Sequence, residues 1–282
     1  MQKITITLTR YAEPNWLLLE TLNSLVKQEK VIATVLMLDQ KNDQVIADFC
    51  QQNSTPNIRL VYQTIPAKSL SFARNEAIRM CETAILLYID TDAIAEPKWA
   101  YELSEGMYKH DAAVGGGKII AKWHRSPGFL QKSPLVLEQY SMLDLGDNDL
   151  EVKKIIGANF GLNIHKLEKL AYFDENMGRK NGKLLGGEET SLCAAAIKAG
   201  YRVFYFGKSK VYHQVLPERI NFKWICKRMY YGGYSRALQG GMPSPNNKTK
   251  QWNKWDIVAL CCLLPAYVLG FVLAKLDRSN KQ

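Results

Sequence analysis

The sequence lacks the short motifs that mark several common enzyme classes. It contains no Cys-x-x-Cys pair, and the spacing of its six cysteines does not indicate a zinc site. No Gly-x-Ser-x-Gly hydrolase motif is present, and no Gly-x-Gly-x-x-Gly fingerprint follows the first predicted strand. Residues 115–118 (GGGK) do not form a phosphate-binding loop, because Ala112 replaces its first glycine and Ile119 its Ser or Thr. We expect these glycines to permit close backbone approach within a strand.

The N-terminus shows no signal-peptide pattern, since a strand-like alternation begins almost at once. Three of the cysteines fall inside apolar helical patterns, and both features favour a reducing, cytoplasmic compartment. The 282 residues include 37 Lys and Arg against 27 Asp and Glu, a net charge of +10. Such an excess suits nucleic acid, an anionic membrane surface or a phosphate-bearing ligand, with a solubilising surface charge as the alternative. No recognised nucleic-acid module is present, so we expect no nucleic-acid partner.

One apolar run stands out near the C-terminus. Residues 257–274 carry no charge and are bounded by Asp256 and Lys275. Eighteen residues lie at the lower limit for crossing a bilayer, which takes roughly 17–25. Pro265 and Gly270 are tolerated in membrane helices, and tryptophans and lysines precede the run as interfacial anchors would. We expect a membrane-associated or transmembrane helix over residues 255–276, and a buried core helix is the alternative.

The first ninety residues alternate strand-like and helical patterns. Apolar strand-like runs occupy residues 4–8, 31–38, 58–62 and 84–89, and helical spacing occurs at 17–26, 45–50 and 69–81. This order predicts an α/β fold with a mixed, mainly parallel sheet and helices on both faces. Further strands are expected near 112–120, 155–164 and 201–212, where the last could be a hairpin, and helices at 188–199 and 221–238. Ligands of such sheets bind beyond the carboxyl ends of the strands.

Two aspartates follow the fourth predicted strand. The run LLYIDTDAI, residues 86–94, places Asp90 and Asp92 directly after four apolar residues. Like charges at this spacing repel unless a cation lies between them or water solvates them. Asp147 and Asp149 share the spacing but lie in a polar stretch, where we expect a solvated turn. Position rather than spacing therefore favours Asp90 and Asp92 as ligands of magnesium or manganese.

Three later features have two interpretations each. Glu188 and Glu189 begin a predicted helix after a glycine pair, either as functional carboxylates or as complements of the helix dipole. His213 closes a strand-like run, either as a third metal ligand or as a structural residue. Arg219 and Arg228 belong to a basic, tyrosine-rich segment. That segment is either a clamp over a diphosphate or lipid-phosphate acceptor, or an ordinary amphipathic helix.

The order of these features resembles that of family 2 nucleotide-sugar glycosyltransferases with the GT-A fold. The matching motifs, in chain order, are Ser24-Leu25, Asp39, Ala73-Arg74-Asn75, Asp90-x-Asp92, Gly157-Ala158-Asn159, Phe173-Asp174-Glu175, Gly187-Glu188-Glu189 and Val211-Tyr212-His213. They span roughly residues 3–240. Each motif alone is weak evidence for the resemblance, but eight motifs in the same order are strong evidence. The chain departs from the family at residues 8–13 (LTRYAE), where Pro-Thr-Tyr-Asn is common, and in a Glu-Glu pair that replaces Glu-Asp.

The resemblance implies a donor site at the strand ends. Asp39 would hydrogen-bond the nucleotide base, and Thr9, Arg74 and Asn75 would line the nucleotide pocket. UDP-sugars are the expected donors. Arg219 and Arg228 are candidates for a clamp on the diphosphate.

The resemblance also implies a metal site. Asp92 would ligate a divalent cation, Mn²⁺ or Mg²⁺, that bridges the donor diphosphate. Asp90 would contact the ribose or a metal-bound water, and His213 would reach the metal or the diphosphate.

On the acceptor side, the resemblance implies that Glu189 is the general base and that Glu188 orients it or contacts the sugar. Because the family's second carboxylate is shorter by one methylene, either glutamate could be the base. Asn159 and Gly187 would face the sugar and the acceptor. Attack from the opposite face of the sugar needs no covalent protein nucleophile, so single displacement with inversion is expected.

We therefore expect an inverting, metal-dependent glycosyltransferase at the cytoplasmic face of the cell membrane, extending a surface polysaccharide or lipid-linked glycan. Its expected parts are a nucleotide-binding half (residues 1–95) and a metal and acceptor half (96–214) of one domain. A basic, aromatic helix and linker (215–254) and the apolar helix (255–276) would follow. The alternative is a catalytically silent, membrane-tethered scaffold of the same fold that binds nucleotide sugar or glycan. Turnover distinguishes the two.

Overall fold

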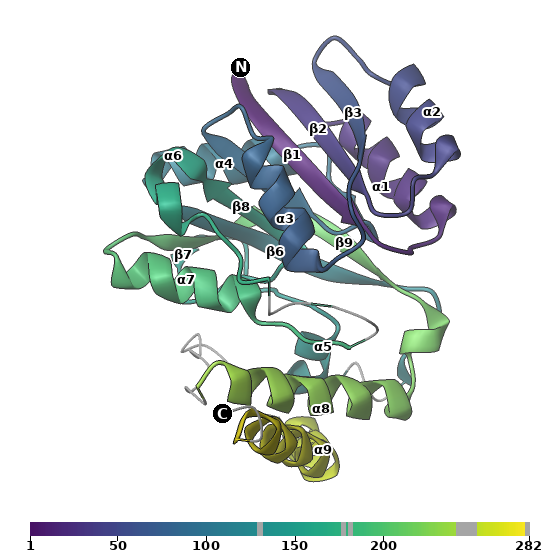
Figure 1. The fold of residues 1–282 in the computed structure, drawn as a ribbon, viewed down its shortest axis with the longest axis vertical. Coiled ribbons are helices and arrows are strands. Elements are labelled where there is room, and N and C mark those ends of the chain that lie inside the picture. Colours follow the sequence, from purple (N-terminus) through teal and green to yellow (C-terminus); the bar gives the residue numbers. More distant parts are fainter. Residues whose placement is uncertain (129–131, 176–178, 180–182, 241–252, 280–282) are drawn as a thin grey trace.

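The computed structural model describes residues 1–128, 132–175, 179, 183–240 and 253–279. Their centre is a nine-stranded mixed sheet with the order β3-β2-β1-β4-β8-β6-β9-β5, and β7 also pairs with β9. Figure 1 shows helices on both faces of this sheet, with α8 and α9 lying beyond its lower edge. The predicted α/β class with a mixed sheet is confirmed.

The first half of the chain forms the parallel part of the sheet. Its strands are β1 (Gln2–Arg10), β2 (Val31–Asp39), β3 (Ile58–Thr64) and β4 (Ile85–Ile89). Its helices are α1 (Asn15–Val26), α2 (Gln44–Gln52) and α3 (Leu70–Arg79). Strand β1 pairs in parallel with both β2 and β4, so their carboxyl ends meet at one edge. The alternation predicted for the first ninety residues is therefore confirmed.

The second half adds the antiparallel pairings. Its elements are β5 (Ala93–Ala95), α4 (Trp99–Lys109), β6 (Val114–Trp123), α5 (Pro134–Gln139), β7 (Asp149–Glu151), β8 (Asn159–Asn163), α6 (Ile164–Leu167), the 3₁₀ turn η2 (Glu168–Leu170), α7 (Glu188–Lys198) and β9 (Val203–Val215). Strand β8 is antiparallel to β4 and β6, whereas β6 and β9 are parallel. The segment that could be a hairpin is the single long strand β9.

The glycines of residues 115–117 do permit close approach, as the sequence predicts. A Cβ added to Gly117 would collide with the backbone carbonyl of Ser209, where the register of β6 and β9 shifts. A Cβ at Gly116 would collide with Ile155, and one at Gly115 with Met107 and Phe206. These glycines therefore serve strand packing.

Two apolar cores lie on opposite faces of the sheet. One contains buried side chains of α1, α2 and α4, such as Leu22, Ile46 and Trp99. The other contains buried side chains of α3 and α7, such as Phe72 and Leu192. The nearly continuous apolar strands are explained by this burial on both faces.

The C-terminal helices form a third cluster with α5. Helix α8 (Phe222–Leu238) follows the 3₁₀ turn η3 (Pro217–Arg219) and packs on α9 (Lys254–Ser279). The two helices meet at glycines, since a Cβ on Gly233 or Gly270 would collide with the backbone of the other helix at Tyr267 or Tyr230. Among the described residues, one helical stretch, Lys254–Asp277, is long enough and apolar enough to cross a membrane. Only 17% of its most apolar 18-residue window is buried.

Candidate active site

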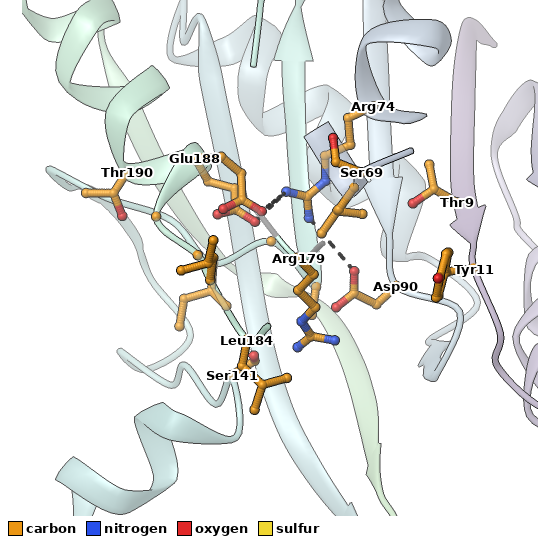
Figure 2. Close-up of a pocket in the computed structure, with 18 of the residues that line it drawn as sticks. Thr9, Tyr11, Ser69, Arg74, Asp90, Ser141, Arg179, Leu184, Glu188 and Thr190 are labelled. Carbon is orange, nitrogen blue, oxygen red and sulfur yellow. Dashed lines mark hydrogen bonds and ion pairs between the residues drawn. The ribbon is translucent and has the colours of Figure 1, made fainter. Parts of the chain in front are cut away.

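A cavity of about 370 Å³ opens at the carboxyl ends of β1 and β4. Its wall is completed by residues 154–158 before β8, by residues 183–190 around the start of α7, and by Arg228 of α8. Figure 2 shows Thr9 and Tyr11 on one side of this space and Glu188 and Thr190 on the other. The cavity therefore lies where an α/β sheet places its ligands.

Asp90, Asp92 and His213 come together at this edge. Their ligand atoms all lie within 4.8 Å of one another. Asp90 and Asp92 follow β4, and His213 reaches them from β9, which pairs with β5 at Ala93. Two carboxylates and one imidazole form a donor set that suits a hard or borderline divalent cation. The three residues predicted as metal ligands are thus neighbours in the fold, whereas their roles as ligands stay a prediction.

The two aspartates differ in their partners. Asp92 is 7% exposed, and its carboxylate meets Nε2 of His213 at 3.1 Å and Nη1 of Arg219 at 2.9 Å. Burial raises the pKa of Asp92, but His213 and Arg219 outweigh burial and hold it well below the usual range. Burial and the neighbouring Asp92 raise the pKa of Asp90, which is 30% exposed and faces the cavity. Asp92 is therefore the more firmly ionised of the pair.

Arg74 connects the metal candidates to the two glutamates. Its Nη1 lies 2.7 Å from Glu189 and 3.0 Å from Glu188, and its Nη2 lies 4.0 Å from Asp90. The guanidinium is 3% exposed and lies over the rings of Phe160 and Phe173. Burial lowers the pKa of Arg74, but the three carboxylates outweigh this and raise it. Arg74, predicted to line the nucleotide pocket, is thus placed by the structure among the acidic side chains.

The glutamates at the start of α7 have unequal environments. Burial and the adjacent Glu189 raise the pKa of Glu188 to about 7. Oε2 of Glu188 is buried with no hydrogen-bond partner among the described residues. Glu189 is more exposed, at 14%, and its carboxylate fills the space beside Gly157, where a Cβ would collide with it. Two carboxyl groups that share one arginine, Arg74, therefore line the cavity.

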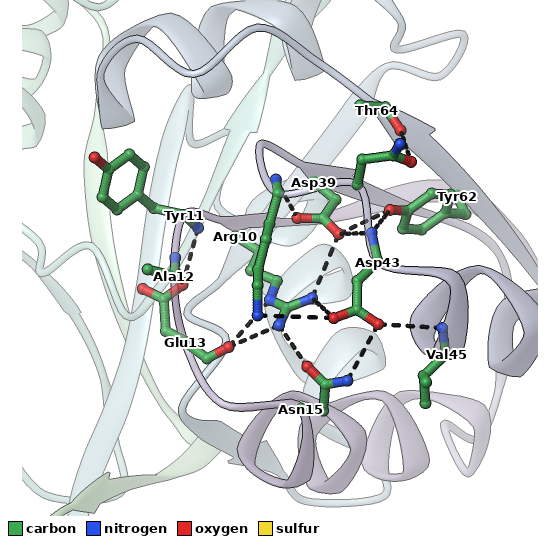
Figure 3. A network of polar contacts seen from close by, with 12 residues as sticks. Arg10, Tyr11, Ala12, Glu13, Asn15, Asp39, Asp43, Val45, Tyr62 and Thr64 are labelled. Carbon is green, nitrogen blue, oxygen red and sulfur yellow. Dashed lines mark hydrogen bonds and ion pairs between the residues drawn. The ribbon is translucent and has the colours of Figure 1, made fainter.

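Asp39, predicted to bind the nucleotide base, is fully buried at the end of β2 and does not line the cavity. Its carboxylate accepts hydrogen bonds from the Tyr62 hydroxyl at 2.8 Å, from the backbone of Lys41 and Asp43, and from Arg10 at 3.4 Å (Figure 3). Arg10 also meets Asp43 at 3.3 Å. Arg10 stands in the segment that departs from the family pattern, and it neutralises the aspartates at this strand end. The base-binding role of Asp39 stays a prediction.

Two predicted site asparagines lie outside the cavity. Asn75 donates to the carbonyl of Phe173 at 2.9 Å and accepts from its backbone N–H at 2.9 Å. Asn159 accepts from the indole of Trp99 at 2.8 Å and donates to the carbonyls of Lys118 and Ser209. In this structure both amides join segments distant in sequence, and the structure does not bring them to the other site residues.

Helix α8 holds the loop that leads into α7. Arg228 donates to the carbonyl of Leu184 at 2.7 Å, and Gly186 N donates to Ser235 Oγ at 3.1 Å. Gln239 donates to the carbonyl of Gly187, whose φ of +100° suits glycine. The predicted arginine pair is separated: Arg219 contacts Asp92, and Arg228 lies at this loop.

Several lining residues were missed by the sequence interpretation. Arg179 reaches into the cavity between Asp90 and Leu184 (Figure 2), and Tyr11, Ser141 and Lys154 also line it. The sequence around them has no periodic hydrophobic pattern, so only their nearness to recognised motifs could have indicated them.

Asp147 and Asp149, the second Asp-x-Asp pair, belong to no candidate metal-ligand group among the described residues. Asp147 is 79% exposed and pairs with Lys118, and Asp149 begins β7 and meets His110 at 3.0 Å. The expected solvated turn therefore holds for Asp147, while Asp149 belongs to a short strand.

Comparisons with known proteins agree with this geometry. A solved structure described as GalNAc-T7 with UDP, GalNAc and Mn²⁺ is similar with a TM-score of 0.59 and 13% identity, over 86% of this chain and 52% of that one, which shows a shared GT-A-like fold. A curated relative, the glucosyl-dolichyl phosphate glucuronosyltransferase of Haloferax volcanii, is 26% identical over 174 residues. The match covers 61% of this chain but only 56% of that relative, so the chain spans little more than half its length. The model of the family described as glycosyl transferase family 2 matches residues 6–170, more than half of the chain, which therefore belongs to that family.

Proposed function

We propose that this glycosyltransferase moves a sugar from a nucleoside-diphosphate donor to a hydroxyl of a lipid-linked or glycan acceptor, with inversion and with a divalent cation. The observation that carries the proposal is that Asp90 and Asp92, which lie beside His213, line one cavity together with Glu188 and Glu189. A metal cluster and a carboxyl pair are the two parts that the reaction needs.

Mn²⁺ or Mg²⁺ fits the residues at the strand edge. The donor atoms of Asp90, Asp92 and His213 are close enough to share one ion. When bound, the cation would neutralise the charge that develops on the leaving diphosphate. Arg219, already at Asp92, would add a second positive charge on that side. The similar GalNAc-T7 structure contains UDP and Mn²⁺, which supports this assignment and a UDP-sugar donor.

The glutamate pair supplies the base. A carboxylate within hydrogen-bond reach of the acceptor hydroxyl accelerates its attack by about 10²–10⁴-fold. Glu188 holds its proton up to about pH 7, and Glu189 is the more exposed of the two, so we propose Glu189 as the base. Glu188 would orient it through their shared contact with Arg74. Attack from the face opposite the diphosphate would invert the anomeric centre. Product analysis by NMR should show inversion, and retention would contradict the mechanism.

Helix α9 and the curated relative support the proposed acceptor and location. The relative's name describes transfer of a glucuronosyl group to glucosyl-dolichyl phosphate, a lipid-linked sugar. Helix α9 presents exposed apolar side chains such as Val268, Leu269 and Val272. We propose attachment to the cytoplasmic face of the cell membrane and a role in polysaccharide or lipid-linked glycan synthesis. Residues 1–95 and 96–214 would act as the donor and acceptor halves, 215–254 as the basic helix and linker, and 255–276 as the membrane segment.

Release of nucleoside diphosphate tests the proposal. The full chain in detergent should turn over one of a panel of sugar nucleotides when Mn²⁺ or Mg²⁺ is present and stop when EDTA is added. Failure with every donor, together with tight binding of a sugar nucleotide, would instead identify a silent scaffold.

A further inference from the structure

Two arginines of the cavity form no close ion pair in the described part of the chain. Arg228 of α8 is half-buried and donates to the carbonyl of Leu184, and Arg179 reaches in between Asp90 and Leu184 (Figure 2). In the described part of the chain, neither guanidinium has a carboxylate oxygen within 4.0 Å. The nearby glutamates are instead held by Arg74.

Arg228 is half-buried without a close ion pair among the described residues, whereas Arg179 is exposed. Removing a charged group from water costs free energy unless an opposite charge or hydrogen bonds replace the water. Burial and the like charge of Arg179 lower the pKa of Arg228 to about 10, and they outweigh the attraction of the more distant Glu188 and Glu189. A ligand carrying an oxyanion would relieve this cost.

The position of Arg228 indicates which oxyanion it would meet. The donor diphosphate belongs with Asp92, which has its own arginine, Arg219. Arg228 lies at the loop before α7, beside Gly186 and on the side of Glu188. Its helix rests directly on the apolar α9 through close contacts at Gly233 and Gly270. A phosphate attached to a lipid chain in the membrane would thus lie nearer to Arg228 than to the candidate metal ligands.

We propose that Arg228 and Arg179 form a second oxyanion site in the cavity, which binds the phosphate of a lipid-linked acceptor. The inference rests on the proposed transferase function and deepens it, because it names the anionic acceptor group. Two arginines can each donate forked hydrogen bonds to phosphate oxygens, a geometry for which guanidinium groups are well suited. The same contacts would turn the acceptor's far end towards the glutamate pair.

Binding measurements on the full chain in detergent test this site without requiring turnover. Calorimetry with farnesyl phosphate, with farnesol as the uncharged match, reports the acceptor site, and UDP with Mn²⁺ reports the donor site. Farnesyl phosphate should bind at least about tenfold more tightly than farnesol. Arg228→Gln and Arg179→Gln should each weaken its binding about tenfold or more, the usual loss for one charge-assisted hydrogen bond. Arg228→Lys should keep part of the affinity.

The controls separate the possible failures. Lys227→Gln changes an exposed charge next to Arg228 on the same helix and should leave both affinities unchanged. UDP binding should persist in every variant, which also shows that each one folds. Equal binding of farnesol and farnesyl phosphate, or a turnover defect in Arg228→Gln with unchanged farnesyl-phosphate binding, would overturn the inference alone. Wild-type protein that binds neither UDP nor any other nucleoside diphosphate with Mn²⁺ would overturn the proposed function as well.

Discussion

In the cavity, Nη1 of Arg74 lies 2.7 Å from Oε1 of Glu189, although the two residues belong to helices from opposite halves of the chain. The same guanidinium lies 4.0 Å from Asp90. One buried cation thus joins the candidate base to the candidate metal site. Its position makes Arg74 a positioning residue for the proposed reaction.

Replacing Arg74 by lysine should therefore impair catalysis more than donor binding. Lysine keeps the charge but cannot reach two glutamates and Asp90 with one planar group. We expect kcat to fall by about 10²-fold, a loss comparable to that of a misplaced general base. The KM of the donor should change much less, and steady-state kinetics measures both quantities.

Arg79→Lys is the matched control on the same helix. Arg79 is exposed and pairs with Glu76 one turn away, so the change should leave turnover and stability nearly unchanged. A similar small effect of Arg74→Lys would contradict the positioning role.

Glu188→Gln should alter the pH dependence of stability. Because the pKa of Glu188 is raised from 4.5 to about 7, the folded protein keeps a proton that the unfolded chain has lost within this window. The contribution of Glu188 to stability is therefore full below pH 4.5 and is lost as pH rises through 7. Glutamine mimics the protonated form. Relative to wild type, the variant should gain up to about 3 kcal/mol of unfolding free energy between pH 5 and pH 8.

Denaturant titrations at the two pH values measure this difference. Glu168→Gln is the matched control. Glu168 is exposed and makes no contact with Arg74 among the described residues, so this variant should show no change in the pH dependence of stability. Parallel pH profiles for wild type and Glu188→Gln would show that Glu188 is ionised normally in the folded protein.

Adjacent glycines on α8 allow a matched test of the contact with α9. A Cβ at Gly233 would collide with the backbone of Tyr267, whereas one at Gly232 would make ordinary contact with the Tyr267 ring. Gly233→Ala should destabilise the protein by about 1–3 kcal/mol through overpacking. Gly232→Ala should be neutral or stabilise the helix by up to about 1 kcal/mol.

Gly233→Ala should also lower turnover, whereas Gly232→Ala should not. The reason is that Ser235 and Gln239 at the end of α8 hydrogen-bond the loop before α7. Thermal unfolding and nucleoside diphosphate release, both in detergent, provide the measurements. Identical behaviour of the two variants would mean that α9 does not set the position of α8.

The strand ends were predictable because apolar strands buried on both faces leave a clear pattern. That pattern placed Asp39, Asp90 and Asp92 at one sheet edge, and the order of motifs added Glu189 and His213. The direction of each side chain was less predictable. Asn159 points into the junction of α4, β6 and β9 because Trp99 and two carbonyls need its amide there.

Side-chain contacts between residues far apart in the sequence could not be predicted either. Arg10 and Tyr62 cover Asp39, and Arg74 binds the glutamates more than a hundred positions away. Such pairs carry no local signal, because a charged residue at a strand or helix end is equally compatible with solvent. The sequence around Arg179 and Ser141 has no hydrophobic periodicity from which their place in the cavity could follow.

The most direct test of the proposed mechanism compares the two Asp-x-Asp pairs of the chain. Nucleoside diphosphate release from the preferred sugar nucleotide should be measured with Mn²⁺ for Asp92→Asn and for Asp147→Asn. The buried Asp92 faces His213 and Arg219, whereas Asp147 is exposed and pairs with Lys118. We predict loss of at least about 10²-fold in Asp92→Asn, as for removal of one transition-state charge contact, and wild-type turnover in Asp147→Asn. Wild-type turnover in Asp92→Asn would contradict the metal-dependent mechanism.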